Sequence, residues 1–438
     1  MEWWLVLIII MGVLVFLLAT GLPVAFCFML INLVGVFVYW GGVTGFINLI
    51  LSMFTSITFF ALVPVVMFVL MGEVMFHSGI FVHAIDTLDN WLGRLPGRLG
   101  LLAVGSATLF STLSGSSMGT TAMLGSLLTP EMERRGYKKP MSLGAVLGAG
   151  GLAMIIPPSA LAVILAALAE ISVGKLLMAG VLPGLLIAAL YAIYIIGRCK
   201  LQPSIAPAYE PVTIPLSQKL VNTARYVLPF GIVVVIVIGL IFMGVASPTE
   251  SAAMAALVIF IITAFYGRLN RGVVKNSVRG TLAICIMMFI ILTGSTAFSQ
   301  ILAYSGASRG LVQFIADLHL PPIVLLIAMQ VVILILGCLM EQVSIMMISF
   351  PIFLPIVQAL GFDLIWFGLL VLINMEIGLT SPPFGLTLFV MKGVAPPDTT
   401  MKDIYLAALP FIFCDLIAMS FIIAFPLIAI WLPTFMRY

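Results

Sequence analysis

Two short stretches place backbone carbonyls and hydroxyl groups where a small cation could bind. They are Gly150–Ser159 and Glu376–Gly385, and each contains two consecutive prolines inside a long apolar run. Proline has no backbone N–H and crowds the carbonyl four residues earlier, so that carbonyl loses its helical partner. Such carbonyls are tolerated at bilayer depth only beside water, other protein or a bound ion. We therefore expect two broken helices with free carbonyls at Ala153, Met154, Gly378 and Leu379.

Serine and glycine interrupt another apolar run at residues 111–121, which include Ser114, Ser116 and Ser117. The apolar arms on either side are about 13 residues long, or roughly 20 Å as helix, which is too short to cross a hydrocarbon core of about 30 Å. The pattern therefore predicts a re-entrant hairpin over residues 101–132. A later apolar run predicts a second hairpin over residues 321–358.

The composition is that of a polytopic membrane protein. The chain has 438 residues, of which 63% are hydrophobic and 8% are charged, and its mean hydropathy is +1.28. A soluble protein would carry about a quarter charged residues. We therefore expect an all-α protein embedded in the lipid bilayer. The net charge of +3 comes from basic loops, which report membrane orientation and do not indicate nucleic-acid binding. The five scattered cysteines predict neither a disulfide framework nor a zinc site.

The chain reads as two similar halves joined by a polar, proline-rich linker. We expect the first half to hold scaffold helices over 1–77, the hairpin 101–132 and a broken helix over 141–170, all within residues 1–200. The linker covers 201–225. The second half, 226–438, holds scaffold helices over 226–300, the hairpin 321–358 and a broken helix over 363–395. Prolines and glycines recur at a spacing of 225 residues, since Pro355 follows Pro130 by 355 − 130 = 225 and Gly361 follows Gly136 by 361 − 136 = 225. The double prolines at 157–158 and 382–383 have the same spacing.

The distribution of basic residues predicts that the two halves are inverted in the membrane. The loop after the first hairpin contains Arg134, Arg135, Lys138 and Lys139, whereas its counterpart at 360–363 has no basic residue. Basic loops stay in the cytoplasm. The first loop and the 201–225 linker are therefore predicted to be cytoplasmic, and the counterpart loop faces the other side. Two parallel halves would fit these charges less well.

Each hairpin tip is expected to face the broken helix of its own half and to bind one sodium ion. Hydroxyls and carbonyls without a dense carboxylate cluster favour a monovalent cation over a divalent one, and inverted-repeat transporters hold Na⁺ at helix breaks. The alternative is that serine and glycine only allow close helix packing. In the first predicted site, Ser114, Ser116 and Ser117 would meet the freed carbonyl of Ala153 and the carbonyls near Ile156 and Pro158. The second comprises Leu339, Glu341, Gly378, Ser381 and Pro383.

An anion could bind at the same breaks. Half-helices restart near Ser159 and Phe384, and helix N-termini favour negative charge. No arginine lies deep in an apolar run near either break, so a carboxylate would rely on helix ends, hydroxyls and co-bound cations. The candidate substrate contacts are Ser117, Thr120, Ser159, Thr380 and Glu376.

Four glutamates lie in or beside membrane segments, where ionisable groups are costly and often functional. Glu341 and Glu376 are the candidates for ion coupling because one is at a tip and the other is beside a break. Glu73 and Glu250 are expected to be structural, paired or interfacial.

The residues at the tips and breaks resemble those of the large membrane subunit of tripartite ATP-independent periplasmic (TRAP) transporters. The resemblance extends over nearly the whole chain, and Ala153 stands where that family often has glycine. The stretches that carry it are Ser114–Ala122, Thr129–Tyr137, Ile155–Ser159, Gly180–Gly184, Ser247–Ala252 and Ile377–Gly385.

The resemblance implies an elevator-type carrier in a bacterial or archaeal inner membrane. It implies import of organic acids, such as C4-dicarboxylates, with Na⁺ and without another cofactor. It also implies two partners, a small four-helix membrane subunit and a periplasmic substrate-binding protein. A related single-subunit anion carrier and a pore remain open alternatives. An intramembrane enzyme is disfavoured because the sequence has no H-E-x-x-H motif and no paired aspartates at depth.

Overall fold

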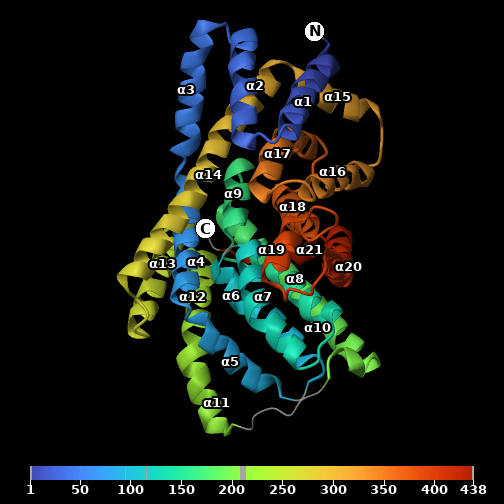
Figure 1. Cartoon of the computed structure of the whole chain (residues 1–438). Helices are drawn as coiled ribbons and strands as arrows, with labels where there is room; N and C mark the ends of the chain where they lie inside the picture. Colours follow the sequence, from blue (N-terminus) through green and yellow to red (C-terminus); the bar gives the residue numbers. More distant parts are fainter. Residues whose placement is uncertain (1, 94, 115, 208–213, 437–438) are drawn as a thin grey trace.

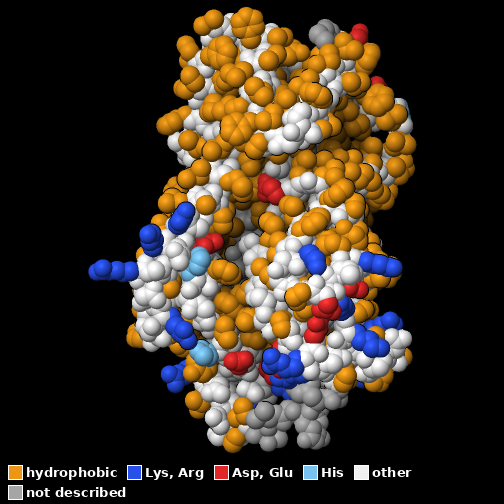
Figure 2. Space-filling model, in the orientation of Figure 1, with side chains coloured by type: hydrophobic (Ala, Val, Ile, Leu, Met, Phe, Trp, Pro, Cys, Tyr) orange, Lys and Arg blue, Asp and Glu red, His pale blue; other side chains and the backbone are white. Residues whose placement is uncertain are grey.

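The computed structural model describes residues 2–93, 95–114, 116–207 and 214–436, and the side chains of residues 110–114 lie outside the described part. Within these ranges the chain forms helices and no β-strand (Figure 1). Among the described residues, seven helices are long and apolar enough to cross a membrane, or eight if one bent pair counts as a single span. The chain is therefore an all-α, multi-pass membrane protein. Hydrophobic side chains cover the upper half of the face in Figure 2, while lysine and arginine gather in its lower half.

The first half contains ten α-helices in the described residues. They are α1 (Trp3–Ala19), α2 (Val24–Tyr39), α3 (Val43–Ile57), α4 (Val63–Ser78), α5 (Phe81–Leu92), α6 (Arg98–Ser114), α7 (Ser117–Arg134), α8 (Lys139–Ile155), α9 (Ala160–Leu168) and α10 (Val173–Leu201).

The second half contains eleven α-helices in the described residues. They are α11 (Leu216–Asn222), α12 (Leu228–Phe242), α13 (Pro248–Phe265), α14 (Arg271–Tyr304), α15 (Ala307–Asp317), α16 (Pro322–Gly337), α17 (Gln342–Ala359), α18 (Leu364–Leu379), α19 (Leu386–Val394), α20 (Met401–Ala424) and α21 (Leu427–Ile430).

Three pairs of corresponding helices begin 225 residues apart, and the other pairs begin within a few residues of that spacing. The starts of α1 and α12 differ by 228 − 3 = 225 residues, those of α7 and α17 by 342 − 117 = 225, and those of α8 and α18 by 364 − 139 = 225. The helix order thus repeats with the spacing of the prolines. The halves differ at one place. In the first half α3 and α4 are separate helices, whereas the corresponding α14 is one helix of 34 residues.

The innermost helices are α8 and α18. Every residue from Met141 to Ile155 of α8 is buried, as is every residue from Trp366 to Leu379 of α18. The two helices pack on each other, and α10 and α20 pack against both. The halves also exchange contacts, since α7 packs on α19 and α17 packs on α9. The second arm of each hairpin therefore lies against the half-helix of the opposite half.

Two predictions about lengths need correction. The first hairpin's arms, α6 and α7, have 17 and 18 residues instead of about 13. They are longer because α6 begins at Arg98 and α7 continues through Glu131 to Arg134, and because both helices reach into the tip, to Ser114 and from Ser117. Arginine and glutamate are good helix formers although they carry charge. The end of the predicted linker is also helical. There α11 continues through a π-helical turn at Thr223–Val227 into α12, where Trp91 of α5 donates a hydrogen bond to Thr223.

Candidate functional site

The first break lies between α8 and α9, whose axes differ by 45°. The N–H of Ile156 still bonds to the carbonyl of Leu152 at 3.0 Å, and the next two residues are the prolines. Among the described residues, no hydrogen bond ends on the carbonyl of Ala153 or Met154. These two carbonyls have the free lone pairs that the sequence predicts.

Two glycines of α10 let that helix approach the first break closely. A Cβ added at Gly180 would collide with the carbonyl oxygen of Ile155, and one at Gly184 would collide with the side chain of Ile156. The Gly180–Gly184 stretch therefore holds α10 against the end of α8. This packing fixes the position of the Ile156 backbone, a predicted ligand.

The first hairpin tip begins α7 beside this break. Ser116 is the N-cap of α7, and its Oγ accepts a hydrogen bond from the N–H of Gly119 at 3.1 Å. The next residue, Ser117, donates from its Oγ to Oε1 of Glu376 at 3.0 Å. The predicted ligand Ser114 has its side chain outside the described residues.

The second break lies between α18 and α19, and here one prediction is wrong. The carbonyl of Gly378 is not free, because it accepts a hydrogen bond from the N–H of Ser381 at 3.1 Å. The chain turns back directly after α18, which brings this N–H over the last turn of the helix. The hydroxyls also bond inward, from Ser381 to the carbonyl of Ile377 at 2.6 Å and from Thr380 to that of Glu376 at 3.0 Å.

The carbonyl of Pro383, another predicted ligand, accepts a hydrogen bond from the Tyr405 hydroxyl at 2.8 Å. Its second lone pair can still bind a cation. The second break therefore offers fewer unoccupied oxygen lone pairs than the first.

The second hairpin tip begins α17 with a carboxylate. Glu341 is the N-cap of α17 and accepts hydrogen bonds from the N–H groups of Val343 at 3.0 Å and Ser344 at 2.8 Å, and from the Ser344 hydroxyl at 2.7 Å. Leu339, whose side chain is exposed, precedes it. A Cβ on Gly337 would lie 2.8 Å from Cα of Gly378, so α16 and α18 approach backbone to backbone.

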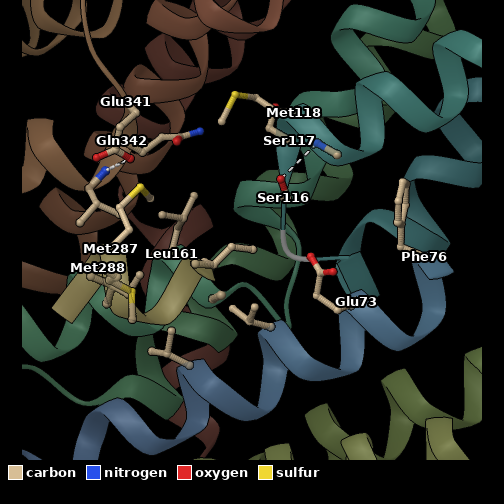
Figure 3. Close-up of a pocket in the computed structure, with 18 of the residues that line it drawn as sticks. Glu73, Phe76, Ser116, Ser117, Met118, Leu161, Met287, Met288, Glu341 and Gln342 are labelled. Carbon is tan, nitrogen blue, oxygen red and sulfur yellow. Dashed lines mark hydrogen bonds between the residues drawn. The ribbon is translucent and has the colours of Figure 1, made fainter. Parts of the chain in front are cut away.

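Both tips line one cavity of about 270 Å³ together with α4, α9 and α14 (Figure 3). Glu341 and Gln342 reach it from the second tip, and Ser116 and Ser117 from the first. Apolar side chains, including Met287 and Met288, form much of the wall. None of the lining residues that the structure describes is lysine, arginine or histidine. The cavity is therefore apolar with two carboxyl groups, Glu341 and Glu73.

The structure places the predicted residues in three environments. Ser116, Ser117 and Glu341 line the cavity. Ala153 is fully buried at the first break, beside the C-cap Ile156 and the buried Pro158. The remaining substrate candidates are buried and are not among the described residues that line the cavity. They are Thr120 in α7, Ser159 as the N-cap of α9, and Thr380 and Glu376 at the end of α18.

Glu73 is paired, as predicted, but the sequence did not show that it lines the cavity, and it did not single out Asp415. Glu73 lines the cavity and also pairs with His77 at 3.2 Å. Glu250, by contrast, forms a capping box with Ser247 at the start of α13, in line with the predicted structural role. Asp415 is buried within α20 and bonded to Tyr191 of α10 at 2.5 Å. The available signal was an acidic residue inside an apolar span.

Residues 11–428 match the family described as "Tripartite ATP-independent periplasmic transporter, DctM component". The chain belongs to this family. It is therefore a TRAP transporter large permease subunit, a class that works with a small membrane subunit and a periplasmic binding protein.

Several curated relatives are similar over nearly their full lengths. The C4-dicarboxylate TRAP transporter large permease protein DctM of Pseudomonas aeruginosa is 33% identical over 394 residues, covering 89% of this chain and 90% of that protein. Its namesake from Rhodobacter capsulatus is 30% identical over 441 residues, covering 97% and 98%. The ectoine TRAP transporter large permease protein TeaC of Halomonas elongata is 27% identical, covering 97% and 98%.

Solved structures of two transporters share the fold. The YdaH transporter of Alcanivorax borkumensis aligns with a TM-score of 0.63 at 15% identity, covering 90% of each chain. MtrF of Neisseria gonorrhoeae aligns with a TM-score of 0.61 at 14% identity, covering 89% of this chain and 85% of that one. At these identities the likeness concerns the fold alone.

Proposed function

We propose that this large permease subunit imports a small organic acid together with sodium ions. A periplasmic binding protein would deliver the acid, and a small four-helix membrane subunit would complete the transporter in a bacterial or archaeal inner membrane. The observation that carries this proposal is the convergence of the tips. Ser116 and Ser117 of one half and Glu341 of the other line a single cavity.

The chemistry at the first break supports sodium as the coupling ion. Two unoccupied carbonyls lie at the end of α8, and the cap hydroxyl Ser116 lies at the start of α7, which packs along α8. Carbonyl and hydroxyl oxygens without a carboxylate cluster favour a monovalent cation. We assign Ser116, Ala153, Ile156 and Pro158 to the first sodium site, with Ser114 as an additional ligand predicted from the sequence.

The second site would use a different balance of ligands. The Gly378 and Pro383 carbonyls each already accept one hydrogen bond. The carboxylate of Glu341 would therefore supply a larger share of the attraction for the ion, with Leu339 and Ser381 contributing their backbone or hydroxyl oxygens.

An acidic substrate fits the cavity only when cations accompany it. The wall carries Glu73 and Glu341 and, among the described residues, no basic side chain. A dicarboxylate entering alone would meet like charge, whereas bound sodium ions would reverse the local potential. Obligatory coupling of the acid to sodium follows from this charge balance.

The repeated helix order supports an inverted repeat and an elevator movement. The corresponding helices α5 and α15 lie near opposite ends of the molecule in Figure 1. We propose that the two hairpins and the two broken helices move together past the long helices of the scaffold, carrying the cavity from one side to the other.

The test is uptake into proteoliposomes that contain the large and small subunits, with the binding protein outside. Radiolabelled C4-dicarboxylates and other carboxylates would be supplied with an inward sodium gradient. The proposal expects saturable uptake that requires both the gradient and the binding protein. Equal uptake without the binding protein would favour a single-subunit carrier, and flux that neither saturates nor follows sodium would favour a pore.

A further inference from the structure

The first turns of α14 carry a row of basic side chains along one side of the helix. Arg271, Lys275 and Arg279 are four residues apart, which places them one above another on the same face. All three are exposed, as is Arg268 in the turn before α14. We call these four residues the basic row. Lysine and arginine side chains project from the left edge of the face in Figure 2, where Figure 1 places α13 and the lower part of α14.

The basic row has no acidic partner within the part of the chain that the structure describes. None of the described ion pairs includes a residue of the row. The sequence contains no aspartate or glutamate between Glu250 and Asp317. Glu73 of α4 does touch α14, because a Cβ on Gly280 would collide with its carboxyl group, but Glu73 is already paired with His77. The positive charges of the row are therefore available to an anion from outside the chain.

The exposed side of α14 becomes apolar directly beyond the basic row. Leu282, Ile286 and Ile290 are exposed and follow the row at helical spacing. The other side of the first turns is buried and includes Val273 and Ser277, and the helix packs on α4. Along its axis, the free side of α14 thus presents positive charge first and hydrocarbon second.

This change from charge to hydrocarbon fits the depth of a membrane interface. The uncharged remainder of α14 covers residues 280–304, which is 304 − 280 + 1 = 25 residues, or about 37 Å of helix. That length spans a hydrocarbon core of about 30 Å. The basic row begins where this uncharged part ends, and the long side chains of arginine and lysine reach outward to the headgroup layer.

An anionic phospholipid carries the complementary groups in the same order, a phosphate followed by acyl chains. We propose that α14 holds a binding site for an anionic phospholipid. The phosphate contacts the basic row, and an acyl chain lies along Leu282, Ile286 and Ile290. Arginine binds phosphate oxygens through two parallel hydrogen bonds, and basic residues beside a membrane helix attract anionic headgroups. A zwitterionic lipid fits less well, because its own ammonium group offsets the phosphate.

Native mass spectrometry of the full chain in a neutral detergent tests this site without any transport assay. The protein is titrated with dioleoylphosphatidylglycerol or with dioleoylphosphatidylcholine, and the dissociation constants of the first bound lipid are compared. We expect phosphatidylglycerol to bind at least about tenfold more tightly, because several basic residues contribute to its binding. Equal affinity for the two lipids would overturn the proposal.

The triple variant Arg271→Gln, Lys275→Gln and Arg279→Gln locates the site. Each basic residue near an anionic surface strengthens binding by about fivefold, so this variant should bind phosphatidylglycerol at least about tenfold more weakly. If it folds poorly, Arg279→Gln alone should lose about fivefold, and an unchanged affinity would contradict the proposal.

The matched control removes the same charge from exposed positions outside the basic row, through Arg198→Gln, Lys200→Gln and Lys402→Gln. This control should keep most of the affinity for phosphatidylglycerol. An equal loss in the two triple variants would show a general attraction between a basic protein and an anionic lipid, and it would overturn the site on α14.

Two further measurements identify what occupies this face of α14. Inorganic phosphate should leave phosphatidylglycerol bound, because phosphate has no chain to lie on Leu282 and Ile286. Displacement of the lipid by phosphate would show a site for a free anion instead. The small membrane subunit should co-purify equally with the unaltered protein and the variant that lacks the basic row. Loss of the subunit with unchanged lipid affinity would assign this face to a protein contact.

Discussion

The two hairpin tips begin with a hydroxyl in one half and a carboxylate in the other. Ser116 caps α7 and Glu341 caps α17, and the two positions correspond, since 341 − 116 = 225. Both side chains accept hydrogen bonds from the first turn of the following helix and both face the same cavity. The two corresponding residues therefore both cap a helix, but one side chain is a hydroxyl and the other is a carboxylate.

The two breaks differ in the opposite sense. Ala153 and Gly378 correspond, since 378 − 153 = 225. The carbonyl of Ala153 has no hydrogen bond among the described residues, whereas that of Gly378 is bonded to Ser381. The first half thus combines the neutral tip residue Ser116 with an unbonded carbonyl at the break. The second half combines the carboxyl group of Glu341 at its tip with a carbonyl that already accepts a hydrogen bond. In the two proposed sodium sites, the first would rely on neutral oxygens and the second more on the carboxylate of Glu341.

The largest effect is expected for Glu341→Ala. This change removes a carboxylate that accepts three hydrogen bonds, and hydrogen bonds to charged groups contribute about 1.5–3 kcal/mol each. We expect the apparent sodium affinity of uptake to fall by about tenfold or more, together with lower thermal stability. Uptake against sodium concentration measures the first effect, and Glu131→Gln is the control for loss of an acidic residue.

The packing at the first break gives the next largest effect. A Cβ at Gly184 has no room beside Ile156, so Gly184→Ala should destabilise the protein by about 1–3 kcal/mol. Gly197→Ala, in the same helix but with nothing within 4 Å, is the matched control and should be neutral or slightly stabilising. Thermal unfolding in detergent compares them. Equal behaviour of the two variants would show that α10 does not position the break.

A smaller effect is expected for Ser116→Ala. Loss of an N-cap hydroxyl costs about 1 kcal/mol, and a lost neutral sodium ligand should lower the apparent sodium affinity several-fold. The effect should be smaller than that of Glu341→Ala, because no charge is removed. The reverse order of effects would contradict the proposed difference between the tips.

The smallest effect is expected at the surface link between the halves, where Lys139 Nζ lies 2.8 Å from Oδ2 of Asp398. The hydrogen bond from Lys139 lowers the pKa of Asp398 below its usual value. A lowered pKa contributes stability above the carboxyl's unfolded pKa, and that stability is lost as the pH falls through the folded pKa. Asp398→Asn should therefore cause a slight loss of thermal stability at neutral pH that vanishes in acid or high salt.

Local rules were enough to predict much of the architecture. The double prolines predicted both breaks, because a missing N–H has the same consequence wherever it occurs. The charge-free runs predicted the membrane helices. The Gly378 carbonyl could not be predicted, since its partner depends on how the chain turns at Ser381. The contact between Glu376 and Ser117 joins residues 259 positions apart, and no local pattern encodes such a pairing.

The capping role of Glu341 shows a similar limit. Its position at a tip was evident from the sequence, but the three hydrogen bonds depend on where α17 begins. Asp415 could have been recognised as an acid within an apolar span, yet its partner Tyr191 lies in the other half of the chain. Pairings across the repeat are what the sequence alone does not reveal.

The most direct test of the proposed division between the tips is a sodium titration of uptake in proteoliposomes for the unaltered protein, Ser116→Ala and Glu341→Ala at matched protein levels. The account predicts that both variants need more sodium for half-maximal uptake, and that Glu341→Ala needs the most. Sodium curves that coincide for all three proteins would contradict it.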